Sequence, residues 1–148
     1  MLNKHKNHLF VYGQAGVSMI EVLVSIIILS IGLLGLAGLQ TASLTQNHSA
    51  NFRSTATVMA YSILDSMRAN RIEAGAGSYN HALEDSAPAS GTLSGQDVGN
   101  WLNELALRLP EGSGSINVDA NNRVTVLIQW DDSRGAAAAQ QFAMTTRL

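Results

Sequence analysis

The chain has 148 residues, nine of them Lys or Arg and eleven Asp or Glu, which gives a formal net charge of −2. This length fits one small domain plus one anchoring helix. The sequence contains no cysteine, which excludes disulfide bonds and thiolate metal sites. Lys and Arg are not clustered, so nothing favours binding to a nucleic acid backbone. We expect no nucleic-acid partner and no cofactor.

Residues 1–16 are polar at their start and carry positive charge only. They contain Lys4 and Lys6 and no acidic side chain. The remaining chain has seven basic and eleven acidic side chains, a formal charge of −4. Positive charge ahead of an apolar span keeps that end of a chain in the cytoplasm. We therefore expect the C-terminal part to lie outside the inner membrane.

An apolar run extends from Gly16 to Leu39, with Glu21 as its single charge. The eighteen residues from Val22 to Leu39 are all uncharged, a length typical of a membrane-spanning helix. A removed secretory signal has a shorter apolar region, of about 7 to 15 residues, and a small residue after it. Here the small residue, Gly16, comes first, so cleavage beside it would leave the helix attached.

Glu21 lies about one turn into this helix. A carboxylate facing lipid costs roughly 2.5 to 3.5 kcal/mol on insertion scales, so we expect a compensating positive charge. The helix start supplies a partial one, and cleavage would add an ammonium group at Val17. Alternatively, the carboxylate reaches the membrane interface by itself.

Three glycines, Gly32, Gly35 and Gly38, recur at every third position, with Ser25 and Ser30 upstream. Small residues at such spacing allow helices to approach closely in a bundle. The alternative is that glycine is simply frequent in membrane helices.

Residues 40–72 contain neither proline nor glycine and predict a continuation of the helix to about Ile72. Asp65 and Arg68 are spaced for an ion pair. Apolar residues recur at intervals of three and four and predict a stripe that packs on a sheet: Phe52, Ala56, Met59, Ala60, Ile63 and Met67. A coiled-coil seam is the alternative, weakened by the small and flexible side chains at the contact positions.

Residues 73–96 predict an irregular loop, because Gly75 and Gly77 stop the helix and further glycines and a proline follow. Three side chains in this loop are candidate metal ligands: His81, Glu84 and Asp85. A set without a fourth ligand is a weak signal, and we expect a solvated loop.

Asp97 is the expected N-cap of a short helix that Pro110 ends. The helix would present one apolar face, formed by Val98, Trp101, Leu102, Leu105 and Leu109. This spacing predicts that Trp101 belongs to the core rather than to an exposed binding surface.

Alternation of apolar and polar residues predicts strands at 115–118, 123–130 and 140–148. Residues 136–139 are alanines that favour a helix by propensity, so the start of the third strand is the least defined boundary. Asp131 and Asp132 lack the spaced ligands of a calcium loop and predict a turn. The expected fold is α+β, a long N-terminal helix packed on an antiparallel sheet of three or four strands.

Four stretches of the sequence resemble type IV pilins. The first joins Gly16 and Glu21 to the apolar helix and is similar to the class III signal of that superfamily. The other three narrow the resemblance to minor pilins: STATVMAYSILDSMRANR (54–71), VTVLIQWDDSR (124–134) and TTRL (145–148). The resemblance extends from Gly16 to Leu148.

This resemblance implies the type IV pilin fold and four regions. They are a leader (1–16), a transmembrane and assembly helix (17–39), its amphipathic continuation (40–72), and a head domain (73–148) outside the inner membrane. A prepilin peptidase would cut between Gly16 and Val17 after insertion by the Sec machinery, and Val17 would be N-methylated. Glu21, at the fifth mature position, would pair with the N-terminal amine of a neighbouring subunit.

The resemblance also implies partners and a location. The partners are other minor and major pilins, prepilin peptidase, the inner-membrane pilus assembly machinery and the membrane itself. The protein would start in the inner membrane with its head in the periplasm and move to the pilus and cell surface on assembly. It would take part in the complex that primes assembly near the tip, and adhesion and twitching motility would depend on it.

The sequence shows no catalytic triad, phosphate-binding loop or metal-binding histidine spacing, so we expect a protein that is not an enzyme. A type II secretion pseudopilin is one alternative, because it shares the same N-terminal features. An uncleaved, signal-anchored periplasmic protein that never assembles is the other.

Overall fold

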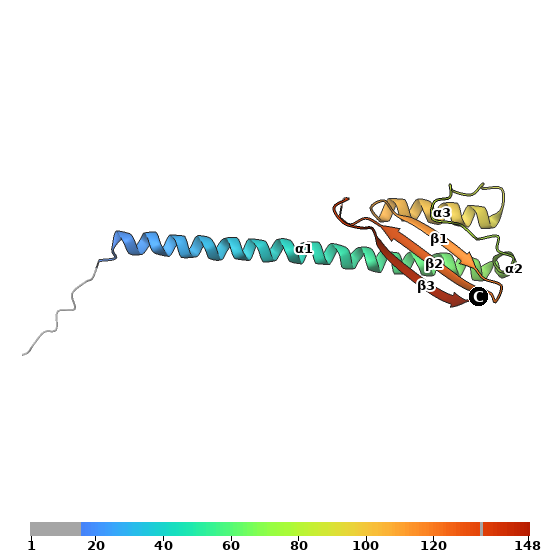
Figure 1. The fold of residues 1–148 in the computed structure, drawn as a ribbon, viewed down its shortest axis with the longest axis horizontal. Helices are drawn as coiled ribbons and strands as arrows, with labels where there is room; N and C mark the ends of the chain where they lie inside the picture. The colour runs from blue at the N-terminus through green and yellow to red at the C-terminus, as the bar shows by residue number, and fades with distance from the viewer. Residues whose placement is uncertain (1–15, 134) are drawn as a thin grey trace, which may run out of the picture. The chain divides into compact units, whose positions relative to one another are not determined.

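The computed structural model describes residues 16–133 and 135–148. Its elements are α1 (Met19–Ala69), α2 (Arg71–Gly75), α3 (Leu93–Arg108), β1 (Ser113–Val118), β2 (Arg123–Trp130) and β3 (Gln140–Arg147) (Figure 1). The strands form one antiparallel sheet in the order β1-β2-β3. The expected α+β class, a long N-terminal helix with a small antiparallel sheet, is therefore confirmed. Contacts divide the chain into an N-terminal unit that ends at Ser43 and a C-terminal unit, Leu44–Leu148.

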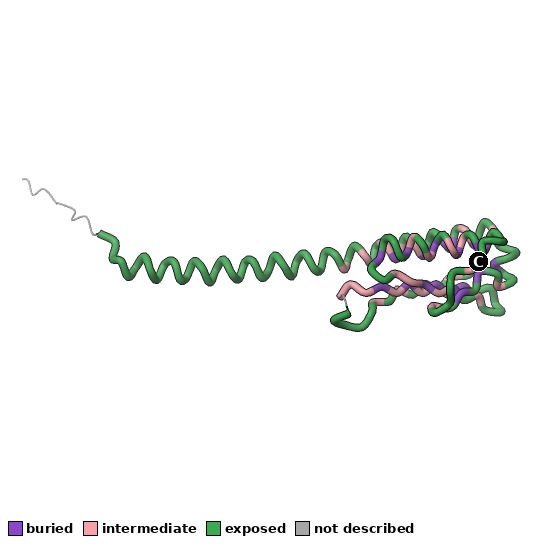
Figure 2. The backbone as a smooth tube through the Cα atoms, turned by 90° about the horizontal axis from the view of Figure 1, so that it is seen from above, coloured by how far each residue is buried: buried purple, intermediate pink, exposed green. Residues whose placement is uncertain are grey.

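Within the C-terminal unit, α1 buries the predicted apolar stripe. Phe52 and Met59 are partly buried against the core, and the fully buried residues of the helix are Ala56, Ala60, Ile63, Leu64 and Met67 (Figure 2). Leu64 widens the stripe beyond the predicted set. Because this stripe packs inside the same chain, it is a core face rather than a coiled-coil seam. The predicted pair is also present on the exposed side, with Arg68 Nη1 2.8 Å from Asp65 Oδ1.

The predicted end of α1 is wrong by three residues. The helix ends at Ala69, and Asn70, with φ −117° and ψ 52°, separates it from the short helix α2. After α2, Gly77 adopts φ +82°, a left-handed conformation that glycine reaches without strain. The predicted glycine stop therefore belongs to α2.

The predicted start of α3 is also wrong. Thr92, not Asp97, is the N-cap, and its Oγ1 accepts a hydrogen bond from Gly95 N at 3.1 Å. Residues 93–96 are thus helical and not part of the loop. Gly95 allows this start, since a Cβ at that position would overlap the Ala89 carbonyl oxygen. Pro110 follows the helix as expected.

The apolar face of α3 closes one side of the core, as predicted. Its buried residues include Val98, Trp101 and Leu105, and Leu109 follows at the C-cap. Trp101 Nε1 donates to the Met59 carbonyl at 3.0 Å and so ties α3 to α1. A Cβ at Gly114 of β1 would overlap the Trp101 ring, so this glycine lets strand and helix pack closely.

Strand β2 is the centre of the sheet and has the boundaries that the sequence predicted. Its buried residues alternate with partly exposed ones and are Val124, Val126, Ile128 and Trp130. Strand β1 begins at Ser113, two residues before the predicted start, and β3 begins at Gln140 as predicted. The alanines at 136–139 form neither helix nor strand.

A tight turn joins β1 to β2. Asp119 Oδ1 accepts hydrogen bonds from Asn121 N and Arg123 N, both at 2.8 Å, and Asn122 has a φ of 56°. These bonds, with the one from Arg123 first, hold the pKa of the Asp119 carboxyl below its usual value. The connection between the two strands is therefore an Asx-type turn.

Candidate processing and assembly site

Most of the predicted leader, residues 1–15, lies outside the described residues. Gly16, Val17 and Ser18 precede α1 in non-helical backbone and are exposed. A Cβ at Gly16 would meet no atom within 4 Å, and Val17 is 71% exposed. The predicted cleavage bond between Gly16 and Val17 therefore lies in exposed, irregular backbone, which is where proteases act most readily.

Glu21 lies in the first turn of α1. The Glu21 and Val22 amides donate to the Ser18 carbonyl at 3.0 and 3.2 Å, so Ser18 begins the helical hydrogen-bond ladder. The Glu21 side chain is exposed and makes no ion pair with any residue in ranges 16–133 and 135–148. The partial positive charge of the helix start is thus the compensation that α1 itself offers.

Glu21 shares one face of α1 with several small residues. An α-helix has 3.6 residues per turn, so residues three, four or seven positions apart lie on the same face. Ser25 follows Glu21 by four residues, Gly32 follows Ser25 by seven, and Gly35 follows Gly32 by three. Gly38 lies off the face. The small residues were singled out from the sequence, but their alignment with the carboxylate, which helical spacing alone reveals, was not.

Neither the two glycines of this face nor Gly38 has a packing role inside the described chain. A Cβ at Gly32, Gly35 or Gly38 would meet no atom within 4 Å. Glycine in a helix interior is less favourable than alanine by about 1 kcal/mol. Three such positions are therefore unexplained by contacts among the described residues, and close approach of another helix would explain them.

Three hydroxyl groups of the N-terminal unit are satisfied by the helix itself. Ser25 Oγ donates to the Glu21 carbonyl and Ser30 Oγ to the Ile26 carbonyl, both at 2.7 Å, and Thr41 Oγ1 donates to the Ala37 carbonyl at 3.0 Å. Such bonds to the carbonyl four residues earlier remove the need for water. These hydroxyls are compatible with an apolar surrounding.

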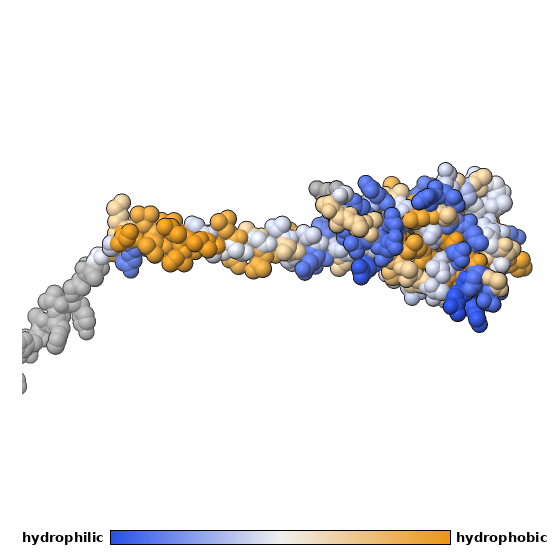
Figure 3. Space-filling view, viewed as in Figure 1, coloured by the Kyte–Doolittle hydropathy of each residue, from blue (hydrophilic) through white to orange (hydrophobic). Residues whose placement is uncertain are grey.

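The aliphatic side chains around this face are exposed on all sides of the helix. Between Val17 and Leu39 the exposed fractions of the large apolar side chains run from 46% at Val24 to 85% at Met19. Figure 3 shows them as a continuous orange surface along the first part of α1. By length and composition, α1 is the helix in the described part of the chain that could cross a membrane.

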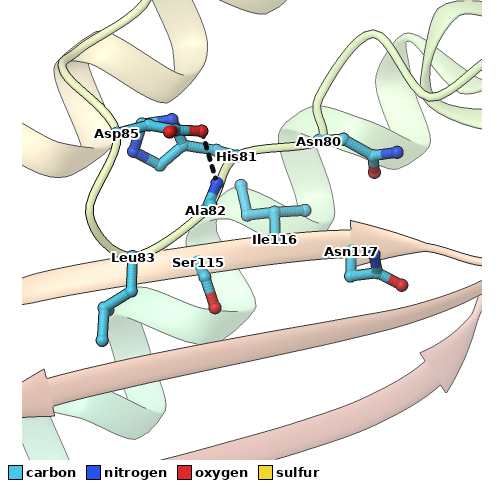
Figure 4. A pocket seen from close by; sticks show the side chains of 8 residues that line it. All are labelled: Asn80, His81, Ala82, Leu83, Asp85, Ser115, Ile116 and Asn117. Carbon is cyan, nitrogen blue, oxygen red and sulfur yellow. Dashed lines mark hydrogen bonds between the residues drawn. The ribbon is translucent and has the colours of Figure 1, made fainter.

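In the C-terminal unit, a hollow of about 470 Å³ lies beside β1 (Figure 4). Asp85 Oδ2 accepts a hydrogen bond from Ala82 N at 3.1 Å, and both residues line this hollow together with His81. The expectation of a solvated loop is wrong for His81, which is 8% exposed because its backbone pairs with Ile116. It is right for Glu84 and Asp85, which are exposed.

No group of three or more metal-binding side chains occurs within ranges 16–133 and 135–148. Asp131 and Asp132 instead organise the end of β2. Asp131 Oδ1 accepts from Ser133 N at 2.8 Å, and Asp132 Oδ2 accepts from Ser49 Oγ of α1 at 2.7 Å. The predicted turn is confirmed, and its second aspartate ties the turn to the helix.

A buried hydrogen-bond network at the far end of the C-terminal unit had no clear sequence signal. The fully buried Tyr79 donates its hydroxyl to Asp97 Oδ2 at 2.6 Å and accepts from Asn70 Nδ2 at 3.2 Å. Burial raises the pKa of the Tyr79 phenol, and the hydrogen bond to Asp97 raises it further. The residue expected to cap α3 therefore fixes the loop after α2.

The comparisons with known proteins give one finding, and it falls on the N-terminal unit. Residues 12–37 match the prokaryotic N-terminal methylation motif. Searches among curated proteins and among solved structures gave no match. The motif contains Gly16, Val17, Glu21 and the two glycines of the Glu21 face, and it is typical of structural proteins that are made as prepilins and anchored in a membrane. The motif indicates a prepilin-like N-terminal segment, and the long apolar helix followed by a small antiparallel sheet is consistent with the type IV pilin fold.

Proposed function

We propose that this chain is a minor pilin of the PilV group, which is cleaved, methylated and built into the complex that primes a type IV pilus. The observation that carries the proposal is the methylation motif at residues 12–37, in which Gly16 and Glu21 stand in prepilin spacing. The three C-terminal stretches that resemble minor pilins favour the narrower assignment. Adhesion and twitching motility would depend on the protein through the pilus.

Processing would begin at the bond between Gly16 and Val17. Both residues are exposed and precede the first turn of α1, so a peptidase reaches the bond without unwinding the helix. Cleavage would remove the lysines of the leader and create a new α-amino group at Val17, which would then be methylated. The apolar helix would remain attached.

Assembly would use the face that contains Glu21. Its carboxylate has no ionic partner within the described chain, and a charge in an apolar bundle is stabilised when it pairs with an amine. The Val17 amine of a neighbouring subunit would supply that pair. Ser25, Gly32 and Gly35 on the same face would let the neighbouring helix approach closely enough to form it.

The partners follow from these steps. Prepilin peptidase and the inner-membrane assembly machinery would act on the membrane-held form, with the C-terminal unit in the periplasm. Other minor and major pilins would replace lipid around α1 when the protein moves into the pilus. No step requires a cofactor or catalysis by this chain.

The first test is the mass of the N-terminal peptide of the membrane-bound protein. We expect a peptide that begins at methylated Val17. Gly16→Leu should leave residues 1–16 attached, while Gly91→Leu, at an exposed glycine with no atom near its Cβ position, should be processed normally. A native chain that still begins at Met1 would contradict the proposal and favour the signal-anchored alternative.

The second test separates insertion from assembly. Glu21→Val should leave the protein in the inner membrane but lower its amount in sheared pili about tenfold or more, since a charge-assisted bond contributes roughly 1.5–3 kcal/mol. The matched control is Glu84→Val, which removes an exposed carboxylate in a loop. Equal amounts of both variants in pili would contradict the role of Glu21.

A type II secretion pseudopilin is the second candidate, because the methylation motif occurs in both machines. Deletion of the gene distinguishes them. Loss of surface pili with normal export of secreted proteins supports the minor pilin. The reverse pattern supports the pseudopilin.

A further inference from the structure

The two outer edges of the sheet differ in whether another segment of the C-terminal unit pairs with them. On the outer edge of β1, His81 N donates to the Ile116 carbonyl and Ile116 N to the His81 carbonyl, both at 2.9 Å. Val118 N donates to Asn80 Oδ1 at 2.8 Å. The edge of β1 is therefore covered by the segment that follows α2.

Strand β3 forms the other edge, and the register fixes which of its backbone groups point outward. Leu148 N donates to the Asn122 carbonyl at 3.1 Å, which makes these two residues a hydrogen-bonded pair. Hydrogen-bonded and non-bonded pairs alternate in an antiparallel ladder. The amides and carbonyls directed away from β2 are consequently those of Gln141, Ala143, Thr145 and Arg147.

We call these four residues the open edge. None of their backbone groups takes part in a hydrogen bond with another residue of ranges 16–133 and 135–148. Figure 1 shows β3 as the outermost strand of the sheet. A row of four unpaired residues is a template on which a further strand can form main-chain hydrogen bonds.

As far as Thr146, strand β3 lacks the features with which proteins discourage strand addition. From Gln140 to Thr146 it carries no charge and no proline, and its register with β2 is continuous without a bulge. Phe142, Met144 and Leu148 pack against the core but remain partly exposed. Apolar side chains of an added strand would cover them further.

Charge distinguishes one end of the open edge from the rest. Arg147 lies directly opposite Arg123, and like charges in this position are unfavourable. Asp119 is close enough to both arginines to feel their charge. An acidic side chain placed beside Arg147 would add a second negative charge next to the two arginines.

From these observations we propose that the open edge binds an extended segment of a different protein, antiparallel to β3, with alternating apolar side chains and an acidic residue beside Arg147. The ladder gives the interaction its affinity, and the arginine pair sets its direction and register. The surface lies wholly within the C-terminal unit. It therefore acts independently of cleavage at Gly16 and of the Glu21 face.

The probe is a synthetic peptide of eight residues with an acetylated N-terminus and a C-terminal fluorescent label. It begins with glutamate and continues with alternating valine and threonine, so that glutamate lies beside Arg147 and the valines follow the side of Phe142 and Met144. The full chain in detergent is titrated into it, and fluorescence anisotropy is measured. We expect saturable binding, weakened about fivefold when lysine replaces the glutamate.

Two variants test the position of the bound strand. Ala143→Pro removes an outward amide without breaking a bond to β2 and should abolish peptide binding. Ala138→Pro, in the exposed loop before β3, should leave binding unchanged. Arg147→Glu, a surface change, should make the lysine peptide the tighter binder and so tests the proposal even if Ala143→Pro disturbs folding.

Three results would overturn the proposal. They are equal binding by Ala143→Pro and Ala138→Pro, an unchanged order of the two peptides with Arg147→Glu, and no binding of either peptide. Sedimentation of the unmodified chain tests whether a second copy of the chain binds the open edge instead. A dimer that Ala143→Pro dissociates would show that β3 pairs with a second copy and not with a different protein.

Discussion

The two parts of α1 differ in where their apolar surface goes. In the N-terminal unit, large aliphatic side chains cover all sides of the helix and none is buried in the chain. In the C-terminal unit, the same helix is apolar on one stripe, and that stripe is buried against α3 and the sheet. A helix that is apolar all round needs lipid or other helices, whereas a striped one needs only one partner layer.

Polar side chains show the same contrast. In the N-terminal unit, the hydroxyls of Ser25, Ser30 and Thr41 bond to their own helix. In the C-terminal unit, some polar side chains also bond within their helix, but others join distant segments, as Ser49 does with Asp132 and Tyr79 with Asp97. The first part can therefore exchange one apolar surrounding for another without losing bonds, while the second part specifies a single structure.

The largest expected effect comes from truncating the buried stripe. Ile63→Ala should lower the free energy of unfolding of the C-terminal unit by about 2–5 kcal/mol, because Ile63 is 1% exposed and the change leaves a cavity. Urea unfolding of the full chain in detergent, followed by tryptophan fluorescence, measures it. The matched variant Ile31→Ala, at a residue 66% exposed in the N-terminal unit, should shift it by less than about 0.5 kcal/mol. Equal shifts would contradict the division into two regions.

A smaller effect is expected where β1 approaches α3. Gly114→Ala should destabilise the C-terminal unit by about 1–3 kcal/mol, because the added methyl group overlaps the Trp101 ring. Gly99→Ala, in α3 but with no atom near its Cβ position, should be neutral or stabilising by up to about 1 kcal/mol. The same unfolding assay compares them, and a destabilising Gly99→Ala would show that glycine has another role in α3.

Tyr79→Phe should cost about 1 kcal/mol at neutral pH, since Asp97 and Asn70 lose their shared partner. The pKa of Tyr79 is raised in the folded state, so this stabilisation is complete below the usual pKa of 10.0 and is lost as the pH rises through the folded value. The free energy of unfolding is therefore measured at neutral pH and above pH 10. Its decrease between the two pH values should be smaller for Tyr79→Phe than for the native chain. Tyr61→Phe, at an exposed tyrosine, is the control and should follow the native chain.

Periodicity explains why much of the fold could be predicted. The step of three and four residues identified the buried face of α1, and alternation identified β2 to the residue. One boundary that failed depends on a single local bond. The start of α3 is set by the hydrogen bond that Thr92 Oγ1 accepts from Gly95 N. Because glycine in a sequence usually indicates a turn or loop, Gly95 predicted a loop where the first turn of the helix lies.

The sequence carries information on a site only where the chemistry is local. Gly16 and Glu21 belong to one short motif, so their spacing alone predicts a prepilin-type segment, and the motif match covers both residues. The burial of His81 and the link from Tyr79 to Asp97 depend on segments brought together by folding. The open edge of β3 could not be predicted either, because it is defined by the strand that is missing beside it and by the segment that covers β1.

The smallest effect on the isolated chain is expected at the Glu21 face. Gly32→Ala should leave the unfolding of the C-terminal unit unchanged, because its Cβ meets no atom of the described chain and alanine favours the helix. In cells it should lower the amount of protein in sheared pili severalfold, since the methyl group separates α1 from the neighbouring helix that Glu21 is proposed to meet. Gly38→Ala adds the same methyl group away from that face and should assemble better than Gly32→Ala. If both variants assemble like the native chain, the glycines reflect only the composition of a membrane helix, and the pairing of Glu21 would have to occur without close helix contact.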